Sequence, residues 1–133
     1  MKPVRFGIIG VGGMGQGHCN SMKKVEEVKL TAVCDIDPAT AQKVGTTHAV
    51  PFFTDANQLI RSKLCDAVLV STPHPQRPPI VIAAMKAGLH VLSEKPLSER
   101  VSTADQMIKT AKATGVAFGV MFQRRAEPVY IKA

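Results

Sequence analysis

The first strand-like run of the sequence ends in closely spaced glycines, and this arrangement restricts the fold more than any other feature. Residues 4–9, VRFGII, are largely apolar, which is typical of a parallel strand buried on both faces. Gly10, Gly12 and Gly15 then follow the pattern G-x-G-x-x-G. In a dinucleotide-binding turn, these glycines permit an unusual backbone conformation, close approach of a pyrophosphate and tight helix packing. The sequence therefore predicts a strand, a glycine turn and a helix whose N-terminus binds an anion.

The segment after the glycine turn supplies the other features that a dinucleotide site requires. Residues 14–24 can form the helix, and residues 28–34 form a second apolar strand that ends at Asp35. An acidic residue about 20 positions after the glycines can accept hydrogen bonds from the ribose hydroxyls, and its charge repels a 2′-phosphate. No lysine or arginine directly follows Asp35. We therefore expect NAD as the cofactor, in preference to NADP.

Apolar runs and helical segments continue to alternate along the chain, which favours a parallel sheet with helical crossovers. The sequence predicts an α/β fold, a doubly wound, mostly parallel Rossmann sheet of about six strands with helices on both faces. The expected helices are residues 38–45, ending at Gly45, a short helix from the cap Asp55 to Ile60, residues 78–87 before Gly88, and residues 103–114 between the cap Ser102 and Gly115; the expected strands are residues 48–53 at an edge, 66–71, 89–92 and 116–122.

Two loops follow strands and reach the edge of the sheet where parallel-sheet proteins bind ligands. The sequence TPHP, residues 72–75, follows one strand, and SEKP, residues 93–96, follows the next. Lys95 could hydrogen-bond a substrate hydroxyl and stabilise the alkoxide that develops as hydride leaves. Ordinary turn chemistry also accounts for Thr72 and its proline, and a solvated ion pair also accounts for Glu94 beside Lys95.

Composition argues against several other classes of protein. The chain has 133 residues and a net charge of +7, but its basic residues are scattered and it has one tyrosine and no tryptophan. A nucleic-acid surface needs clustered basic and aromatic side chains, so we expect no nucleic-acid partner. No apolar run reaches the ~18 residues of a membrane helix, and the N-terminus lacks the apolar core of a signal peptide. We therefore expect a cytoplasmic protein with no membrane partner.

Isolated cysteines and histidines do not form a recognisable ligand set. Cys19, Cys34 and Cys65 are far apart and form no CxxC pair, so we expect buried, reduced thiols. His48 has no acidic or thiol neighbour at ligand spacing, and no metal site is predicted. His18 lies on the first predicted helix, where a packing role and a role beside the cofactor both remain open.

Four runs together resemble the glucose-fructose oxidoreductase / inositol dehydrogenase (Gfo/Idh/MocA) family. They are GVGGMGQGH, VCD, STPH and AGLHVLSEKP, and the likeness covers essentially the whole chain. The resemblance implies an NAD(P)-dependent oxidoreductase acting on a hydroxyl of a sugar, cyclitol or related polyol, with Lys95 as the catalytic residue and often with a cis bond between Lys95 and Pro96. It implies that the cofactor is bound by Gly10, Gly12, Gly13, Met14, Gly15, Asp35, Ser71, Thr72, Pro73, His74, Glu94 and Lys95.

Two positions depart from the usual pattern of the family. His74 stands where asparagine is common, and Arg77 stands where histidine is common. The contacts of this loop with the nicotinamide half of the cofactor can therefore differ from those of relatives.

Family enzymes carry a second α/β domain that supplies most of the substrate pocket. By resemblance, residues 1–122 correspond to the NAD(P)-binding domain, and residues 123–133 correspond to the start of a crossover into a second domain that this sequence lacks. The resemblance thus implies a cofactor-binding half that is incomplete as an enzyme. An apolar surface left exposed by a missing domain could promote self-association as a homo-oligomer. A non-catalytic NAD-binding or sensing module, or a truncated family member, is the alternative that the sequence leaves open.

Overall fold

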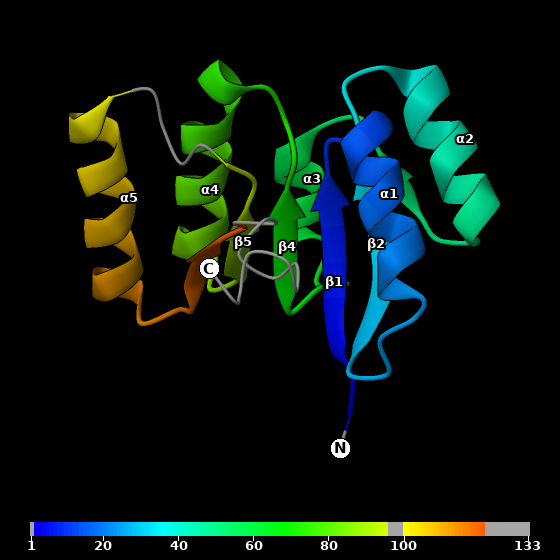
Figure 1. The fold of residues 1–133 in the computed structure, drawn as a ribbon, viewed down its shortest axis with the longest axis horizontal. Coiled ribbons are helices and arrows are strands. Elements are labelled where there is room, and N and C mark those ends of the chain that lie inside the picture. Colours follow the sequence, from blue (N-terminus) through cyan, green and yellow to red (C-terminus); the bar gives the residue numbers. More distant parts are fainter. Residues whose placement is uncertain (1, 96–99, 122–133) are drawn as a thin grey trace, which may run out of the picture.

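Six parallel strands form one sheet in the order β3-β2-β1-β4-β5-β6 (Figure 1). The structure, a computed structural model of the chain, describes residues 2–95 and 100–121. The order runs outward from β1 and β4 in opposite directions, which is the doubly wound arrangement that the sequence predicts. The elements are β1 (Val4–Ile9), α1 (Gly13–Met22), β2 (Val28–Cys34), α2 (Pro38–His48), β3 (Phe52–Phe53), α3 (Ala56–Arg61), β4 (Ala67–Val70), the 3₁₀ turn η1 (His74–Gln76), α4 (Arg77–Lys86), β5 (His90–Ser93), α5 (Val101–Thr114) and β6 (Phe118–Val120).

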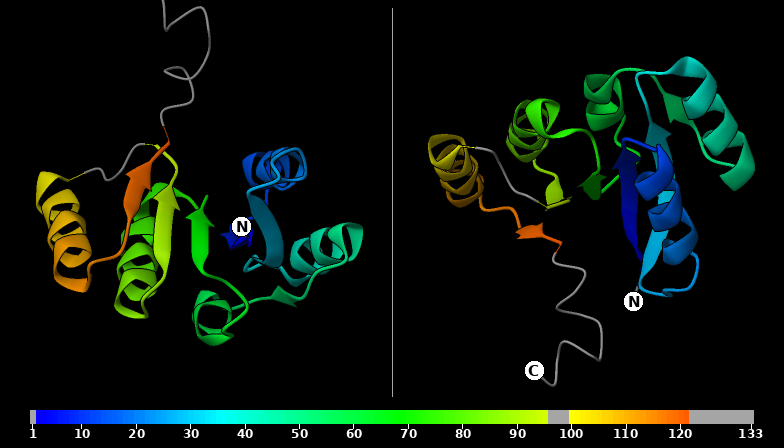
Figure 2. Two further views of the ribbon diagram at one scale, coloured as in Figure 1. Left: turned by 90° about the horizontal axis from the view of Figure 1, so that it is seen from below. Right: turned by 45° about the horizontal axis from the view of Figure 1, so that its top comes forward.

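Helices cover both faces of the sheet, as predicted (Figure 2). On one face, Cys19 of α1 and Val44 of α2 share a buried cluster with strand residues such as Ile8. On the other face, Leu59 of α3 and Met85 of α4 belong to a second buried cluster. All four residues of β4 are buried, as expected for a central strand that is covered on both sides. Among the described residues, no helix is both long and apolar enough to cross a membrane.

The second helix extends beyond its predicted end at Gly45. α2 continues to His48, and Ala49 ends it in the left-handed conformation with φ 55°. Gly45 does not end the helix. Glycine is needed there for α2 to pack against β3, because a Cβ on residue 45 would lie 2.9 Å from the Cβ of Phe52. The predicted strand over residues 48–53 is therefore wrong for residues 48–51 and confirmed only for Phe52–Phe53, whose position at the sheet edge is also confirmed.

The last helix begins earlier than predicted. α5 starts at Val101 after Arg100, whose backbone is extended, so Ser102 lies in the first turn and does not cap the helix. A serine signals a helix start only to within a residue or two. At the other end, Gly115 ends α5 in the left-handed conformation with φ 75°, as predicted. β6 is shorter than the predicted strand, whose final residue lies outside the described part of the chain.

The cysteines are buried and form no disulfide, as predicted. Burial raises the pKa of Cys19 to about 11 and that of Cys34 to about 12. Because the thiolate is the reactive form, we expect Ellman's reagent at about pH 8 to modify no cysteine quickly in the folded protein. All three should react in denaturant. A thiol that reacts as fast as free cysteine before unfolding would contradict this burial.

Candidate functional site

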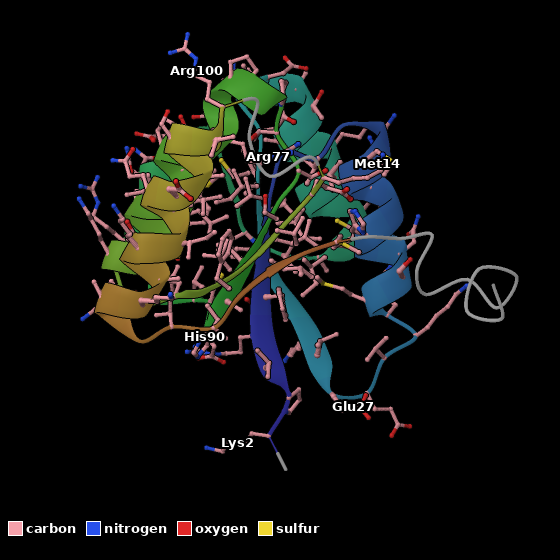
Figure 3. All side chains as sticks on the ribbon, turned by 60° about the vertical axis from the view of Figure 1, so that its left-hand side comes forward. Lys2, Met14, Glu27, Arg77, His90 and Arg100 are labelled. Atoms are coloured by element: carbon pink, nitrogen blue, oxygen red, sulfur yellow. The ribbon has the colours of Figure 1, made fainter. Side chains whose placement is uncertain are left out.

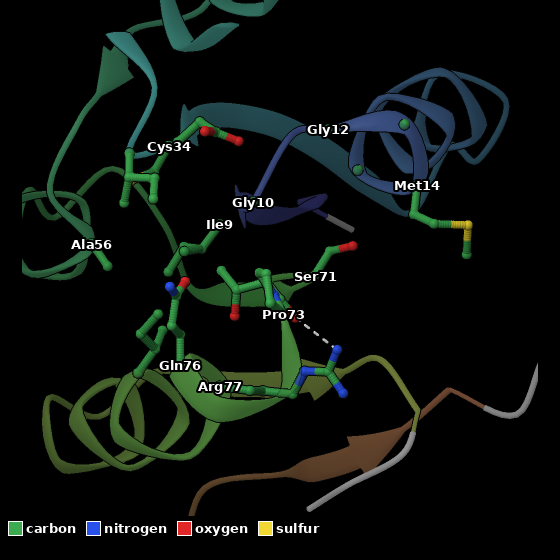
Figure 4. A pocket seen from close by; sticks show the side chains of 16 residues that line it. Ile9, Gly10, Gly12, Met14, Cys34, Ala56, Ser71, Pro73, Gln76 and Arg77 are labelled. Carbon is green, nitrogen blue, oxygen red and sulfur yellow. Dashed lines mark hydrogen bonds between the residues drawn. The ribbon is translucent and has the colours of Figure 1, made fainter.

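A cavity of about 520 Å³ opens at the carboxyl ends of β1, β2 and β4 (Figure 4). It lies where the strand order reverses, which is the usual position of a ligand in an open parallel sheet. Figure 3 shows Met14 and Arg77 at this end of the molecule, and His90 and Glu27 at the other. The cavity has the size of a small-molecule site. The sequence-predicted residues that line it are Gly10, Gly12, Gly13, Met14, Gly15, Asp35, Ser71, Thr72 and Pro73.

The glycine turn forms one wall of the cavity, and its glycines serve different purposes. Gly10 has φ 92°, and a Cβ there would lie 2.8 Å from the backbone of Ser71. A Cβ on Gly15 would collide with the carbonyl oxygen of Gly10. By contrast, a Cβ on Gly12 or Gly13 would meet no atom within 4 Å. The fold itself thus requires glycine at 10 and 15, whereas the space in front of 12 and 13 is open.

The N-terminus of α1 faces this open space without a side-chain cap. Gly12 is the N-cap residue, and the first helical hydrogen bond runs from Gln16 N–H to the Gly12 carbonyl at 2.9 Å. The N–H groups of the first turn have no partner within a helix and carry its positive dipole end. Gly13 and Met14 of this turn line the cavity. This arrangement suits an anionic group such as a pyrophosphate.

The Asp35 carboxylate lies beside the glycine turn at the end of β2. Its Oδ2 accepts a hydrogen bond from Val11 N–H at 3.0 Å, and its Oδ1 accepts one from Asp37 N–H at 2.9 Å. Two carboxylate oxygens offer about four acceptor positions, so Asp35 can accept further hydrogen bonds from a ligand. The negative charge is therefore held in a fixed position at the cavity wall.

Arg77, the first residue of α4, joins the loops that follow β4 and β5. It is 4% exposed, its Nη2 donates to the Thr72 carbonyl at 2.7 Å (Figure 4), and its Nη1 donates to the Glu94 carbonyl at 2.8 Å. Burial lowers the pKa of the Arg77 guanidinium, and the Glu94 carboxylate acts in the opposite direction. The Glu94 side chain in turn bonds through Oε1 to Nε2 of His18 on α1. These contacts link α4, α1 and the loops that follow β4 and β5.

The hydroxyl of Thr72 is a buried polar group without a protein partner among the described residues. Its Oγ1 makes no hydrogen bond with them, although Thr72 is only 9% exposed and lines the cavity. A buried hydroxyl normally finds a partner. The hydroxyl is therefore a candidate contact for a bound ligand.

The remaining predicted residues lie beside the cavity or outside the described set. Glu94 is buried and does not line the cavity, and Lys95 is exposed on the loop after β5. The backbone of His74 begins the turn η1, while its side chain is not described. The bond between Lys95 and Pro96, for which a cis form is predicted by resemblance, also lies outside the described residues.

Sequence reasoning missed the part that Arg77 and His18 take in this site. Arg77 is noted only as a departure from a family pattern, and the role of His18 is left open. The contact between His18 and Glu94 spans 76 residues of sequence, so no local pattern indicates it. The available signal is topological, because α1 and the loop after β5 meet at the same edge of the sheet.

Residues 4–122 match the family described as an oxidoreductase family with an NAD-binding Rossmann fold, GFO_IDH_MocA. The chain belongs to this family. It is 35% identical over 133 residues to the inositol 2-dehydrogenase/D-chiro-inositol 3-dehydrogenase of Shouchella clausii, with 97% of this chain and 38% of that enzyme covered.

Solved structures of the GFO_IDH_MocA family share the fold. A myo-inositol 2-dehydrogenase from Lactobacillus plantarum has a TM-score of 0.92 and 33% identity, with 98% of this chain and 40% of that chain covered. A scyllo-inositol dehydrogenase from Lactobacillus casei, with bound NAD(H) and scyllo-inositol, has a TM-score of 0.93 and 25% identity, with 98% and 39% covered. The chain thus spans about two-fifths of the length of the relatives it matches.

Proposed function

We propose that this chain is the cofactor-binding half of an NAD-dependent oxidoreductase that transfers a hydride between nicotinamide and a hydroxyl-bearing carbon of an inositol, another polyol or a sugar. The observation that carries the proposal is the open space before Gly12 and Gly13, at the N-terminus of α1 and beside Asp35. Such a helix terminus binds a pyrophosphate, and such a carboxylate binds ribose hydroxyls. The inositol dehydrogenases among its relatives support the proposal.

In this proposal, different residues bind the cofactor and assist the reaction. The N–H groups of Gly13 and Met14 hold the pyrophosphate, Asp35 holds the ribose, and Thr72 Oγ1 donates to the ligand. Bound NAD⁺ supplies the hydride acceptor. Lys95 hydrogen-bonds the reacting hydroxyl and stabilises the negative charge that develops on its oxygen. The Glu94 carboxylate is held by His18 of α1.

We further propose a division of the chain at the end of the family match. Residues 1–122 would form the cofactor domain, and residues 123–133 would lead into a second domain that holds most of the substrate pocket. The relatives, which are more than twice as long as this chain, support that division. A homo-oligomeric interface would then also involve the second domain.

An assay of NAD⁺ reduction tests this function. The protein encoded by the whole reading frame around these residues is mixed with NAD⁺ and with myo-inositol, scyllo-inositol or a panel of sugars. We expect NADH to form with at least one of them. Binding of NAD⁺ without turnover of any polyol or sugar would favour a non-catalytic NAD-binding or sensing module.

The names of other relatives add a second reaction to the same screen. A Shewanella pealeana protein that is 33% identical over 124 residues, covering 86% of this chain and 27% of that protein, is named glycosyl hydrolase family 109 protein. The screen therefore includes glycosides with a chromogenic leaving group. Release of that group without accumulation of NADH would assign glycoside hydrolysis in place of net polyol oxidation.

Replacing Asp35 with serine should reduce discrimination between NAD⁺ and NADP⁺. The wild-type carboxylate can bind ribose hydroxyls and repels a 2′-phosphate, so we expect NAD⁺ to bind more tightly. Serine removes the charge, and we expect the ratio of the two dissociation constants to fall by about tenfold, or ~1.4 kcal/mol. Fluorescence titration with NADH and NADPH measures that ratio. The ratio is the informative quantity, because the variant also loses the bond to Val11 N–H.

A matched control removes a carboxylate far from the cavity. Asp105 is exposed on α5, and Asp105→Ser should keep the wild-type ratio. Equal or tighter binding of NADP(H) by the wild-type protein would contradict the role assigned to Asp35.

A further inference from the structure

The proposed function does not explain why Arg77 is buried beside the cavity. Arg77 as a whole is 4% exposed, and a charge buried to that extent is retained only when strong partners replace the water. Arg77 finds partners in two backbone carbonyl groups, those of Thr72 and Glu94. Its charge is also balanced by the Glu94 carboxylate nearby.

Those two carbonyl groups lie just beyond the paired ends of neighbouring strands. Val70 of β4 pairs with Ser93 of β5, and Glu94 N–H donates to the Val70 carbonyl at 3.0 Å. After this bond the two segments continue as loops, of which the one after β4 lines the cavity. Arg77 bonds one carbonyl in each loop, at 2.7 and 2.8 Å, and so extends the link between the strands beyond the sheet.

The hydrogen bond from Arg77 to the Glu94 carbonyl fixes the peptide group that joins Glu94 to Lys95. A peptide unit is planar, so the direction of the Glu94 carbonyl also sets the direction of Lys95 N–H and the position of its Cα. Ser93 Oγ donates to the same carbonyl oxygen at 3.2 Å. The peptide before Lys95 is therefore held by two side-chain donors, whereas the Lys95 side chain itself is exposed.

We infer that Arg77 is a positioning residue that directs Lys95 toward the bound cofactor and substrate by holding the Glu94 carbonyl against the loop after β4. This inference rests on the proposed function, since it takes Lys95 as the residue to be positioned. A guanidinium suits the task because its rigid fork bonds two acceptors in fixed directions. A lysine has the same charge but places a single ammonium, which does not reproduce the fork.

The inference is tested by following Lys95 directly in the chain. The lysines are labelled by reductive ¹³C-methylation, and the Lys95 signal is assigned by its loss in Lys95→Arg. The shift of that signal on saturation with NAD⁺ is compared in wild type, Arg77→Met and Arg77→Lys. Arg61→Met, which removes an exposed arginine of α3, is the matched control. Circular dichroism establishes that each variant is folded, and a titration establishes that each is saturated.

We expect the NAD⁺-induced shift of Lys95 to be at least about threefold smaller in both Arg77 variants and unchanged in Arg61→Met. The loss in Arg77→Lys separates positioning by the fork from the mere presence of a buried charge. A shift of wild-type size in either folded Arg77 variant would overturn the inference. A wild-type Lys95 signal that does not shift when NAD⁺ binds would also overturn the inference. Failure of both Arg77 variants to fold would overturn it too, since Arg77 would then be purely structural. Absence of NAD⁺ binding in the wild type would instead refute the proposed function.

Discussion

Replacing Gly12 with alanine is expected to weaken NAD⁺ binding by at least about tenfold, or ~1.4 kcal/mol, while leaving the fold intact. The backbone at Gly12 has φ −66°, which alanine adopts readily, and an added Cβ would meet no protein atom within 4 Å. The new methyl group would instead occupy the space through which a pyrophosphate approaches the backbone. Thermal unfolding measures the stability, and calorimetric titration with NAD⁺ measures the affinity.

Gly17 offers a matched control on the same helix. It is exposed, and a Cβ there would also meet no atom within 4 Å. Gly17→Ala should stabilise α1 by up to about 1 kcal/mol, because glycine is a poor helix former, and should leave NAD⁺ affinity unchanged. If Gly12→Ala binds NAD⁺ as tightly as Gly17→Ala does, no phosphate group lies against the turn.

Replacing Lys95 with alanine is expected to lower kcat for polyol oxidation by about 10²-fold to 10⁴-fold in the protein of the whole reading frame. In the proposed function, Lys95 would stabilise charge that develops on the substrate oxygen only as the hydride leaves, so its removal should affect the transition state more than binding. The dissociation constant for NAD⁺ should therefore change far less than kcat. Steady-state kinetics and a separate NAD⁺ titration measure the two effects.

Lys86 provides the comparison for this variant. It is an exposed lysine in the last turn of α4, and Lys86→Ala should keep wild-type kcat. Turnover by Lys95→Ala at the rate of Lys86→Ala would remove Lys95 from the mechanism.

The parts of the fold that the sequence predicts well are those set by local patterns. The strand before Gly10 and the acidic residue at the end of the second strand, Asp35, are both predicted from residues close in sequence. In the structure, the end of that first strand and Asp35 line one cavity. The alternation of strands and helices also predicts the doubly wound sheet, because parallel strands need crossovers that cover both faces. The burial of Cys34 and the other thiols follows from their place in apolar segments.

The parts that the sequence does not predict depend on contacts between distant residues. Gly45 looks like a helix end, but the close approach of Phe52 is what requires a glycine there. The sequence marks Arg77 only as a departure from the family pattern, yet Arg77 is buried between two loops that the sheet topology brings together. The bond from His18 to Glu94 belongs to the same class. Such contacts are fixed by tertiary structure, on which local propensity carries no information.

The central claim is that the cavity between the glycine turn and Asp35 binds the adenosine diphosphate part of NAD. Calorimetric titration of the purified chain with NAD⁺ tests it most directly, with ADP-ribose, which lacks nicotinamide, as a competitor. We expect saturable binding at a single site and displacement of NAD⁺ by ADP-ribose. A chain that is folded by circular dichroism but shows no saturable binding of NAD⁺ or NADH would contradict the claim.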